Sequence, residues 1–216
     1  MRNIAKSENI KSIATKENLP IYIEQLDVTD NESVTNPIQA IVSKADRIDV
    51  LVNNAGYALT GAFEDLAIEE IKAQYETNLF GLIRTTQAVL PIMRKQKSGV
   101  IVNISSGAGR FGYAGASAYI STKFAVEGLS ESMSYELEPF GIKVILVEPG
   151  VIRTNIANGM VVAKKSQNPD SPYFQIMQKM STSFEHMLEK ASSSPDLVAK
   201  VVLQAVTVKI LALVDI

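Results

Sequence analysis

The sequence contains no cysteine, no tryptophan and a single histidine, His186. The lack of cysteine excludes a disulfide framework and a thiolate zinc site, and one histidine excludes a clustered imidazole site, so we expect no metal. A chain without cysteine also fits a cytoplasmic protein. Lys plus Arg total 21 against 23 for Asp plus Glu, with a net charge of −2. Because no charge excess favours polyanions, we expect no nucleic-acid partner.

Long hydrophobic runs are lacking as well. The N-terminal segment MRNIAKSENIKSIATKENLP is charged and polar, without the apolar run of a signal peptide. No stretch approaches the roughly 20 consecutive apolar residues that span a bilayer. We therefore expect a soluble chain with no membrane partner. At 216 residues, its length predicts a single domain over residues 1–216.

Four short runs rich in Ile, Val and Leu indicate strands. They are Ile21 to Leu26, Ile48 to Val52, Gly99 to Ile104 and Ile142 to Val147. Apolar runs without polar alternation are typical of parallel strands that helices cover on both faces. The tail from Val208 to Val214 is compatible with a final strand or with an irregular segment.

Segments with helical spacing follow these runs. Helices are predicted after the candidate cap Asp30, from Ile68 to Ile83 before Pro91, from Ser117 to Leu137, and from Pro195 through Ala205. The alternation of strand and helix predicts the α/β class, with a doubly wound, mostly parallel, Rossmann-like sheet.

Glycine is scarce where such a fold most often needs it. Nucleotide-binding α/β folds normally begin with a strand, a glycine-rich turn and a helix whose N-terminus holds a phosphate. No G-x-G-x-x-G or related cluster precedes Asp27, and the chain starts with a charged segment. We therefore expect an incomplete fold that lacks the first strand-turn-helix unit.

The segment SSGAGRFGYAGASAYISTK places Ser106, Tyr119 and Lys123 within one strand-loop-helix unit. An ammonium four residues from a phenol on a helix stabilises the phenolate and brings the tyrosine toward acid–base work. Ser106, just past a strand end, can hold a substrate oxygen in line with that phenol. A Tyr-x-x-x-Lys pair alone is common on helix surfaces. Here it accompanies a second strand that ends in Asn53-Asn54-Ala55-Gly56.

From about Leu26 to Thr154 the chain resembles the short-chain dehydrogenase/reductase family, with its motifs in order and spacing. The resemblance implies hydride transfer between NADP(H) or NAD(H) and a small alcohol or ketone. The implied catalytic residues are Asn78, which holds a proton-relay water, Ser106, Tyr119 and Lys123. The implied cofactor contacts are Asp27 and Val28 at the adenine, Asn54, Ala55 and Gly56 beside its ribose, Tyr119 and Lys123 at the nicotinamide ribose, and Pro149, Gly150, Ile152 and Thr154 at the carboxamide and phosphates.

Arg2 lies where the family often places an arginine that pairs with a 2'-phosphate, which favours NADP(H) over NAD(H). An ordinary solvated arginine is the alternative. The resemblance also implies that the chain lacks the family's first strand with its TGxxxGxG turn, and that it stops before a last strand and helix. Unpaired strand edges should then make the isolated chain prone to aggregation.

Residues 155–194 are rich in Met, Phe, Ser and Lys. A helix is predicted from the apolar spacing of Phe174, Met177, Met180, Phe184, Met187 and Leu188. The resemblance implies that this segment is a lid over an apolar substrate, and the alternative is a plain core-facing helix. We expect His186 on this helix to face solvent. Gly107, Ala108, Gly109, Tyr113 and Ala114 are expected at the pocket mouth.

Two classes of function remain open at this point. One is an oxidoreductase; the other is a catalytically inactive member of the fold that acts as a binding or subunit-interaction module. The apolar stripe of Val126, Leu129, Met133 and Leu137 fits either burial within the monomer or packing in a homodimer or homotetramer, as the resemblance implies.

Overall fold

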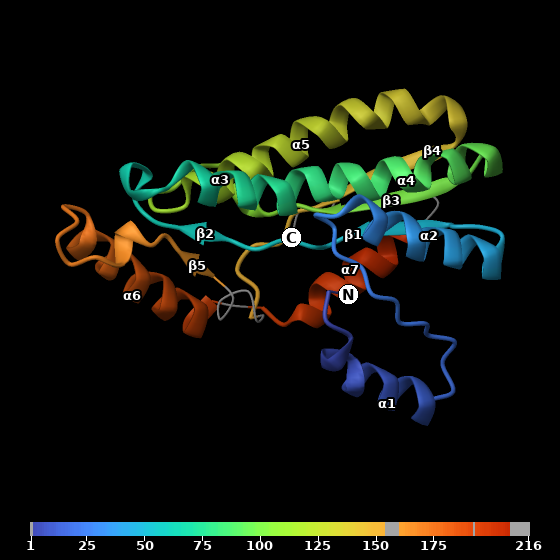
Figure 1. Ribbon diagram of the computed structural model, residues 1–216, viewed down its shortest axis with the longest axis horizontal. Coiled ribbons are helices and arrows are strands. Elements are labelled where there is room, and N and C mark those ends of the chain that lie inside the picture. Colours follow the sequence, from blue (N-terminus) through green and yellow to red (C-terminus); the bar gives the residue numbers. More distant parts are fainter. Residues whose placement is uncertain (1, 154–159, 192, 208–216) are drawn as a thin grey trace.

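The structure is a computed structural model and describes residues 2–153, 160–191 and 193–207. Its centre is a parallel sheet with the strand order β1-β3-β4 and helices on both faces (Figure 1). The strands are β1 (Val50–Asn53), β3 (Gly99–Ile104) and β4 (Ile142–Val147). A smaller parallel sheet pairs β2 (Leu59–Thr60) with β5 (Val161–Val162). The predicted doubly wound, Rossmann-like architecture is confirmed.

The α-helices of the described residues lie on the two faces of this sheet or beside it. They are α1 (Glu8–Lys16), α2 (Asn31–Ala45), α3 (Ile68–Tyr75), α4 (Gly81–Gln96), α5 (Ser117–Leu137), α6 (Phe174–Ala191) and α7 (Pro195–Thr207). Tighter 3-10 turns are η1 (Ile4–Ser7), η2 (Phe63–Asp65), η4 (Gly107–Gly109), η5 (Glu138–Phe140) and η7 (Lys165–Gln167), and η3 (Glu76–Phe80) is a π-helical turn. In Figure 1, α4 and α5 lie over the sheet, α7 lies beneath it, and α1 stands apart. Among the described residues, none of the helices combines the length and the hydrophobicity that crossing a bilayer demands.

The two faces of β3 are both buried, which explains why its sequence is an unbroken apolar run. Ile101 packs against Val89 and Met93 of α4 on one face. Its neighbour Val102 packs against Val201 of α7 on the other face. Both strand residues are 0% exposed. Because successive side chains of a strand point to opposite faces, a strand between two helix layers needs apolar residues at every position.

Two strand predictions require correction. Ile21 to Leu26 is not a strand: the segment is irregular, and Tyr22 is 75% exposed. A strand exists only through a hydrogen-bonded neighbour, and none of the described segments pairs with this one. The run predicted from Ile48 to Val52 forms a strand only from Val50, and β1 is an edge of the described sheet. The final strand considered at Val208 to Val214 lies outside the described residues.

The helix predictions hold with two exceptions, and the first is the π-helical turn η3 within the helix predicted from Ile68 to Ile83. Asp30 caps α2 by accepting a hydrogen bond from the Ser33 amide at 2.6 Å, and α5 has its predicted bounds. By contrast, α4 does not end before Pro91 but continues to Gln96. Both Pro91 and Gln87, whose carbonyl the proline leaves without a partner, are exposed. Water can therefore reach that carbonyl, and the helix survives the proline.

A buried asparagine pair joins the carboxyl ends of β1 and β3. Asn53 Nδ2 donates to Asn103 Oδ1 at 2.9 Å and to Thr86 Oγ1 at 2.9 Å. Thr85 Oγ1 donates to Asn53 Oδ1 at 2.6 Å. On the other side, Asn103 Nδ2 donates to Ser130 Oγ at 2.8 Å. This network fixes α4, β1, β3 and α5 relative to one another by directional polar contacts.

Replacing the inner asparagine tests this network. Asn103→Leu keeps the side-chain size but removes one hydrogen-bond partner from the Asn53 amide and one from the Ser130 hydroxyl. We expect a loss of about 2–4 kcal/mol in the free energy of unfolding, measured in urea with an unchanged m-value. Ser130→Ala, which removes only one partner, should lose about 1 kcal/mol. Unchanged stability of Asn103→Leu would show that the network does not hold the sheet.

Candidate active site

The structure brings Ser106, Tyr119 and Lys123 together at the carboxyl end of β3. Ser106 follows this strand with an extended backbone (φ −170°, ψ 158°), and its Oγ accepts a hydrogen bond from the Ala108 amide at 3.2 Å. Its hydroxyl also lies near enough to the Tyr119 phenol to lower the pKa of that group. Lys123, one turn further along α5, places its Nζ 5.7 Å from the centre of the Tyr119 ring. The strand and the helix therefore deliver the three side chains to one place.

The environment of Tyr119 is largely apolar. Its ring packs against Ala108, Ala116 and Ile120. Burial raises the pKa of the phenol above its ordinary value, and the neighbouring Ser106 hydroxyl offsets part of that rise. This differs from the expectation that Lys123 brings the phenol pKa down, because burial outweighs other influences here. At neutral pH the phenol is protonated and can donate a proton.

Lys123 is a buried amine with a fixed direction. Only 9% of the residue is exposed, and Nζ donates to the Ile104 carbonyl, at the end of β3, at 2.8 Å. Burial lowers the pKa of Lys123 to about 8, and the charge of Glu127 raises it in part. An ammonium has three N–H donors. Within the described part of the chain the Ile104 carbonyl is the acceptor that Nζ reaches, so the remaining donors can serve a ligand.

Asn78 lies in η3, the π-helical turn between α3 and α4. Its Oδ1 accepts from the Tyr57 amide at 3.0 Å, and its Nδ2 donates to the Tyr57 carbonyl at 2.9 Å and to Thr122 Oγ1 at 3.2 Å. Thr122 Oγ1 in turn donates to the Tyr119 carbonyl at 2.7 Å. Asn78 thus ties the first turn of α5 to the loop after β1. The relay water implied for Asn78 stays a prediction.

The loop of Asn54, Ala55 and Gly56 follows β1 and is exposed, at the strand end where open α/β sheets bind ligands. A side chain at position 56 would press on the asparagine of η3: a Cβ there would lie 3.2 Å from Asn78 Oδ1. Glycine at this position therefore permits the close approach of loop and helix.

Asp27 and Val28, expected at the adenine, lie where the irregular N-terminal segment enters α2. The Asp27 carboxylate accepts from the Thr29 amide at 3.0 Å and from Thr29 Oγ1 at 2.8 Å, and these bonds lower the pKa of Asp27. Val28 packs tightly on α4, since a Cβ at Gly81 would lie 2.6 Å from Val28 Cγ2. The carboxylate is therefore held locally, and Val28 is anchored to the helix that follows η3.

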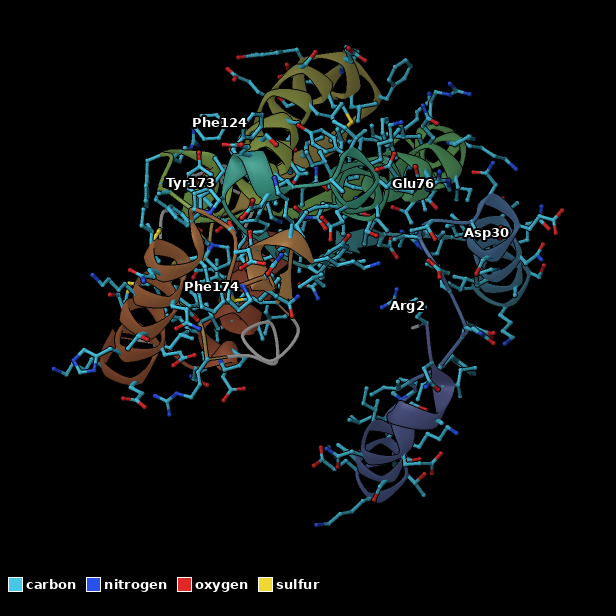
Figure 2. All side chains as sticks on the ribbon, turned by 60° about the vertical axis from the view of Figure 1, so that its left-hand side comes forward. Arg2, Asp30, Glu76, Phe124, Tyr173 and Phe174 are labelled. Atoms are coloured by element: carbon cyan, nitrogen blue, oxygen red, sulfur yellow. The ribbon has the colours of Figure 1, made fainter. Side chains whose placement is uncertain are left out.

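Arg2 is exposed and lies between α1 and the part of the molecule that carries the sheet (Figure 2). Its carbonyl accepts from Gln25 Nε2 at 3.3 Å. After the hydrogen bonds from Thr29, the charge of Arg2 also lowers the pKa of Asp27. Burial raises the pKa of Tyr57, and Arg2 acts against that rise. The guanidinium therefore faces the side of the molecule on which the implied adenine contacts lie.

The segment after β4 lies beside the Ser106 loop, because the Pro149 carbonyl accepts from the Gly107 amide at 3.0 Å. Gly150 is exposed, and Ile152 pairs with Ser193 in an isolated parallel bridge. Thr154 lies outside the described residues. Of the implied carboxamide and phosphate contacts, Pro149 is therefore the one that the structure ties directly to the loop after β3.

The methionines of α6 lie over the loop that precedes Tyr119. A Cβ at Gly115 (φ +79°) would lie 2.9 Å from Met177 Cε and 3.3 Å from Met180 Cε. The helix predicted from the apolar spacing is confirmed, and His186 on it is exposed as expected. Tyr113 from the same loop also lies near Tyr119: burial raises the pKa of Tyr113, and the neighbouring phenol adds to the rise.

Sequence reasoning missed a buried carboxylate that anchors the segment leading into α6. Asp65 of η2 is 2% exposed and accepts from Ser171 Oγ at 2.6 Å and from Ser166 Oγ at 3.0 Å. Lys165 Nζ lies 3.6 Å from its other oxygen. The contacts with Asp65 therefore hold the segment between β5 and α6 against η2. Residues 154–159 of the expected lid lie outside the described residues.

Comparison with known proteins now places this geometry. A model of the short chain dehydrogenase family matches residues 1–165. The chain belongs to this family. It is 39% identical over 213 residues to the uncharacterized oxidoreductase YusZ of Bacillus subtilis, covering 95% of this chain and 74% of that protein. It is 32% identical to retinol dehydrogenase 8 of Bos taurus, over 95% of this chain and 67% of that protein.

Solved structures support the same assignment. A short-chain dehydrogenase from Streptomyces avermitilis has a TM-score of 0.82 and 34% identity, over 99% of this chain and 75% of that one. A gluconate 5-dehydrogenase from Burkholderia cenocepacia, crystallised with NADP and tartrate, has a TM-score of 0.69 and 26% identity over 74% of this chain and 62% of that one. The chain is thus an oxidoreductase of the nicotinamide-dependent short-chain class.

The Asp65 anchor generates a pH-dependent prediction. Hydrogen bonds from Ser171 and Ser166 lower the pKa of Asp65 in the folded chain, so its contribution to stability is present above the unfolded pKa and is lost as the pH falls through the folded pKa. Asp65→Asn should therefore lower the unfolding midpoint at neutral pH, and the difference from the unchanged chain should shrink below about pH 4. Thermal unfolding between pH 3 and 7 measures this. A difference that stays constant with pH would contradict the assignment.

Proposed function

We propose that the chain carries out proton transfer in a short-chain dehydrogenase reaction, with Tyr119 donating a proton to the oxygen of a ketone or accepting one from an alcohol. The observation that carries this proposal is the meeting of the Ser106 hydroxyl, the Tyr119 phenol and the buried Lys123 amine at one strand end. When bound, a nicotinamide cofactor supplies or accepts the hydride, and the protein supplies geometry and the proton.

The residues of the site fit such a cofactor. Lys123 has N–H donors beyond the one that Ile104 accepts, and a vicinal diol such as a ribose offers acceptors for them. Ser106 lies beside the phenol and orients the substrate oxygen toward it. The exposed backbone from Asn54 to Gly56 borders the same strand edge. Binding of the sugar hydroxyls, orientation of the substrate and movement of the proton thus fall to different side chains.

For the cofactor we favour NADP(H) over NAD(H). Arg2 is exposed, and its charge acts on Asp27 and Tyr57. A guanidinium that binds a phosphate in a fork is a common basis for recognition of a 2'-phosphate. The NADP-bound gluconate 5-dehydrogenase supports the nicotinamide class without deciding between the two forms.

For the substrate we propose an alcohol or ketone of low polarity. The side chains of α6 nearest to the Tyr119 loop are Met177 and Met180, which are flexible and apolar. The likeness to a retinol dehydrogenase points in the same direction.

The apolar stripe of α5, for which burial in the monomer and packing between subunits were both open, is buried at Val126 and partly buried at its other positions. Val126 is 0% exposed, and Leu137 packs against the core under α4. The outer side of α5 instead carries Phe124 at 47% and Tyr135 at 69% exposure, and Figure 2 shows Phe124 at the surface. We therefore propose that a homodimer or homotetramer forms through this outer side rather than through the apolar stripe.

Cofactor binding decides between the enzyme and the inactive binding module. Titration with NADPH, followed by fluorescence, should show saturable binding, and Arg2→Ala should weaken it by about tenfold while leaving NADH affinity unchanged. Equal effects on the two cofactors would contradict 2'-phosphate recognition by Arg2. No binding of either cofactor by the folded chain would favour the binding module.

Removal of the phenolic hydroxyl tests the proton donor. Tyr119→Phe keeps the ring in its apolar wall but has no proton to give, so turnover of an apolar ketone with NADPH should fall by at least about 100-fold. The dissociation constant for NADPH should change by less than about threefold, because the ring itself is retained. Steady-state kinetics and fluorescence titration measure the two effects, and retained turnover would refute the assignment.

A further inference from the structure

A second cluster of charged side chains includes Glu127 of α5. Along this helix Tyr119 precedes Lys123, and Glu127 follows it. Glu127 follows Lys123 by four residues, so the two side chains share one face of the helix. Glu127 is 8% exposed. Its charge acts on Lys123 against the effect of burial. A buried carboxylate in this position has no role in the proton transfer proposed above.

The carboxylate is enclosed by groups from the other strand ends. Arg110, from the loop after β3, donates to both Glu148 oxygens, at 2.9 and 2.6 Å. The same guanidinium lies 3.6 Å from Glu127 Oε2. Glu148, which follows β4, is 7% exposed. The loop approaches Glu127 so closely that a Cβ at Gly109 would lie 2.8 Å from Glu127 Oε1. The charged groups that face Glu127 are therefore Arg110 and Glu148. On their own helix, the titratable group beside Lys123 is the Tyr119 phenol.

Glu127 occupies a position that is unfavourable for a carboxylate whose only role is to fill space in the core. Ser105 and Glu148 lie near enough to influence Glu127, but in the described part of the chain no group makes a hydrogen bond of standard geometry to either of its oxygens. Burial raises the pKa of Glu127, Ser105 lowers it, and Glu148 raises it again. An apolar side chain of similar size would avoid this penalty. Besides the Arg110 guanidinium, the charged group that shares this face of α5 is the buried amine of Lys123, one turn earlier.

We propose that Glu127 is a positioning residue for Lys123: its carboxylate, enclosed beside the Arg110 guanidinium, keeps the buried amine charged and directed to the strand end. The effect on turnover rests on the proposed function, but the effect on the amine does not. Without the carboxylate, burial lowers the pKa of Lys123 unopposed, and the neutral amine becomes more populated near neutral pH. A neutral amine can neither attract a phenolate nor offer all its donors to a diol.

The amine itself can be titrated without cofactor or substrate. In chain labelled with 13C-lysine, the signal of the Lys123 side chain is assigned by its loss in Lys123→Arg, and its shift is followed from pH 6 to 11. Glu127→Gln should lower the pKa of Lys123 by at least about 0.5 unit. The matched control is Glu131→Gln, which removes the same charge from an exposed position one turn further along α5 and should leave the Lys123 pKa unchanged.

A second variant covers the case in which Glu127→Gln does not fold. Glu127→Met removes the charge and the polar atoms together, so it should be at least as stable as the unchanged chain and should lower the Lys123 pKa equally. An unchanged Lys123 pKa in either folded variant would overturn the proposal. A fall of similar size in Glu131→Gln would also overturn it, because the effect would then be one of net charge.

Turnover gives an independent readout. In the unchanged chain the alkaline limb of the pH profile for kcat/KM should follow Lys123, and Glu127→Gln should move that limb to lower pH by the same amount as the amine titration. A merely structural defect would lower activity at all pH values alike, and that result would count against the proposal. Absence of turnover in the unchanged chain would count against the proposed function alone.

Discussion

The hydrogen bond between Asn53 and Asn103 is the contact on which the geometry of the site depends. It joins side chains at paired positions of β1 and β3, so β1 ends one residue before the end of β3. Apolar residues on these strands would pack almost as well after a slip along the sheet, whereas a buried amide pair has only one register in which both partners are satisfied. Through Ser130 the same network sets the height of α5, and with it the placement of Tyr119 and Lys123.

Burial governs the chemistry of the two side chains that this scaffold presents. It raises the pKa of the Tyr119 phenol and lowers that of Lys123 to about 8. Both changes favour the neutral forms, so a buried phenol and amine would lose their charges unless neighbouring groups intervened. Ser106 acts on the phenol and Glu127 on the amine. In a site shielded from water, such nearby charges and hydrogen bonds have more effect than they would at the surface.

Sequence reasoning succeeded where the deciding contacts are local or where burial is uniform. The strands from Gly99 and Ile142 had the predicted bounds, because both faces of each are covered. Ser106 and Tyr119 were expected together because a strand end and the following helix meet in this fold. The strand expected at Ile21 to Leu26 failed, since a strand depends on a neighbour that its own residues do not reveal.

The missed residues share a different property: their partners lie far along the chain or are backbone atoms. Thr122 and Tyr57 take part through a short hydroxyl and a peptide unit, which leave no recognisable motif. Asp65 was missed because the serines that bind it are about a hundred positions further along the chain. Glu127 has the helical spacing of an ordinary surface residue relative to Lys123, and only the approach of the loops after β3 and β4 makes it buried.

The π-helical turn of η3 has a consequence for how this helix can vary. A π turn holds one residue more than a regular turn, so α3 and α4 are out of phase by about 100°. Because of this offset, Asn78 faces the loop after β1, while Thr85 and Thr86 of the same continuous helical segment face the buried asparagines. Deletion of a single residue here would restore an unbroken α-helix and swing one of these two faces away from its partners. We therefore expect the fold to tolerate insertions and deletions in the segment from α3 to α4 far less well than substitutions on its exposed side.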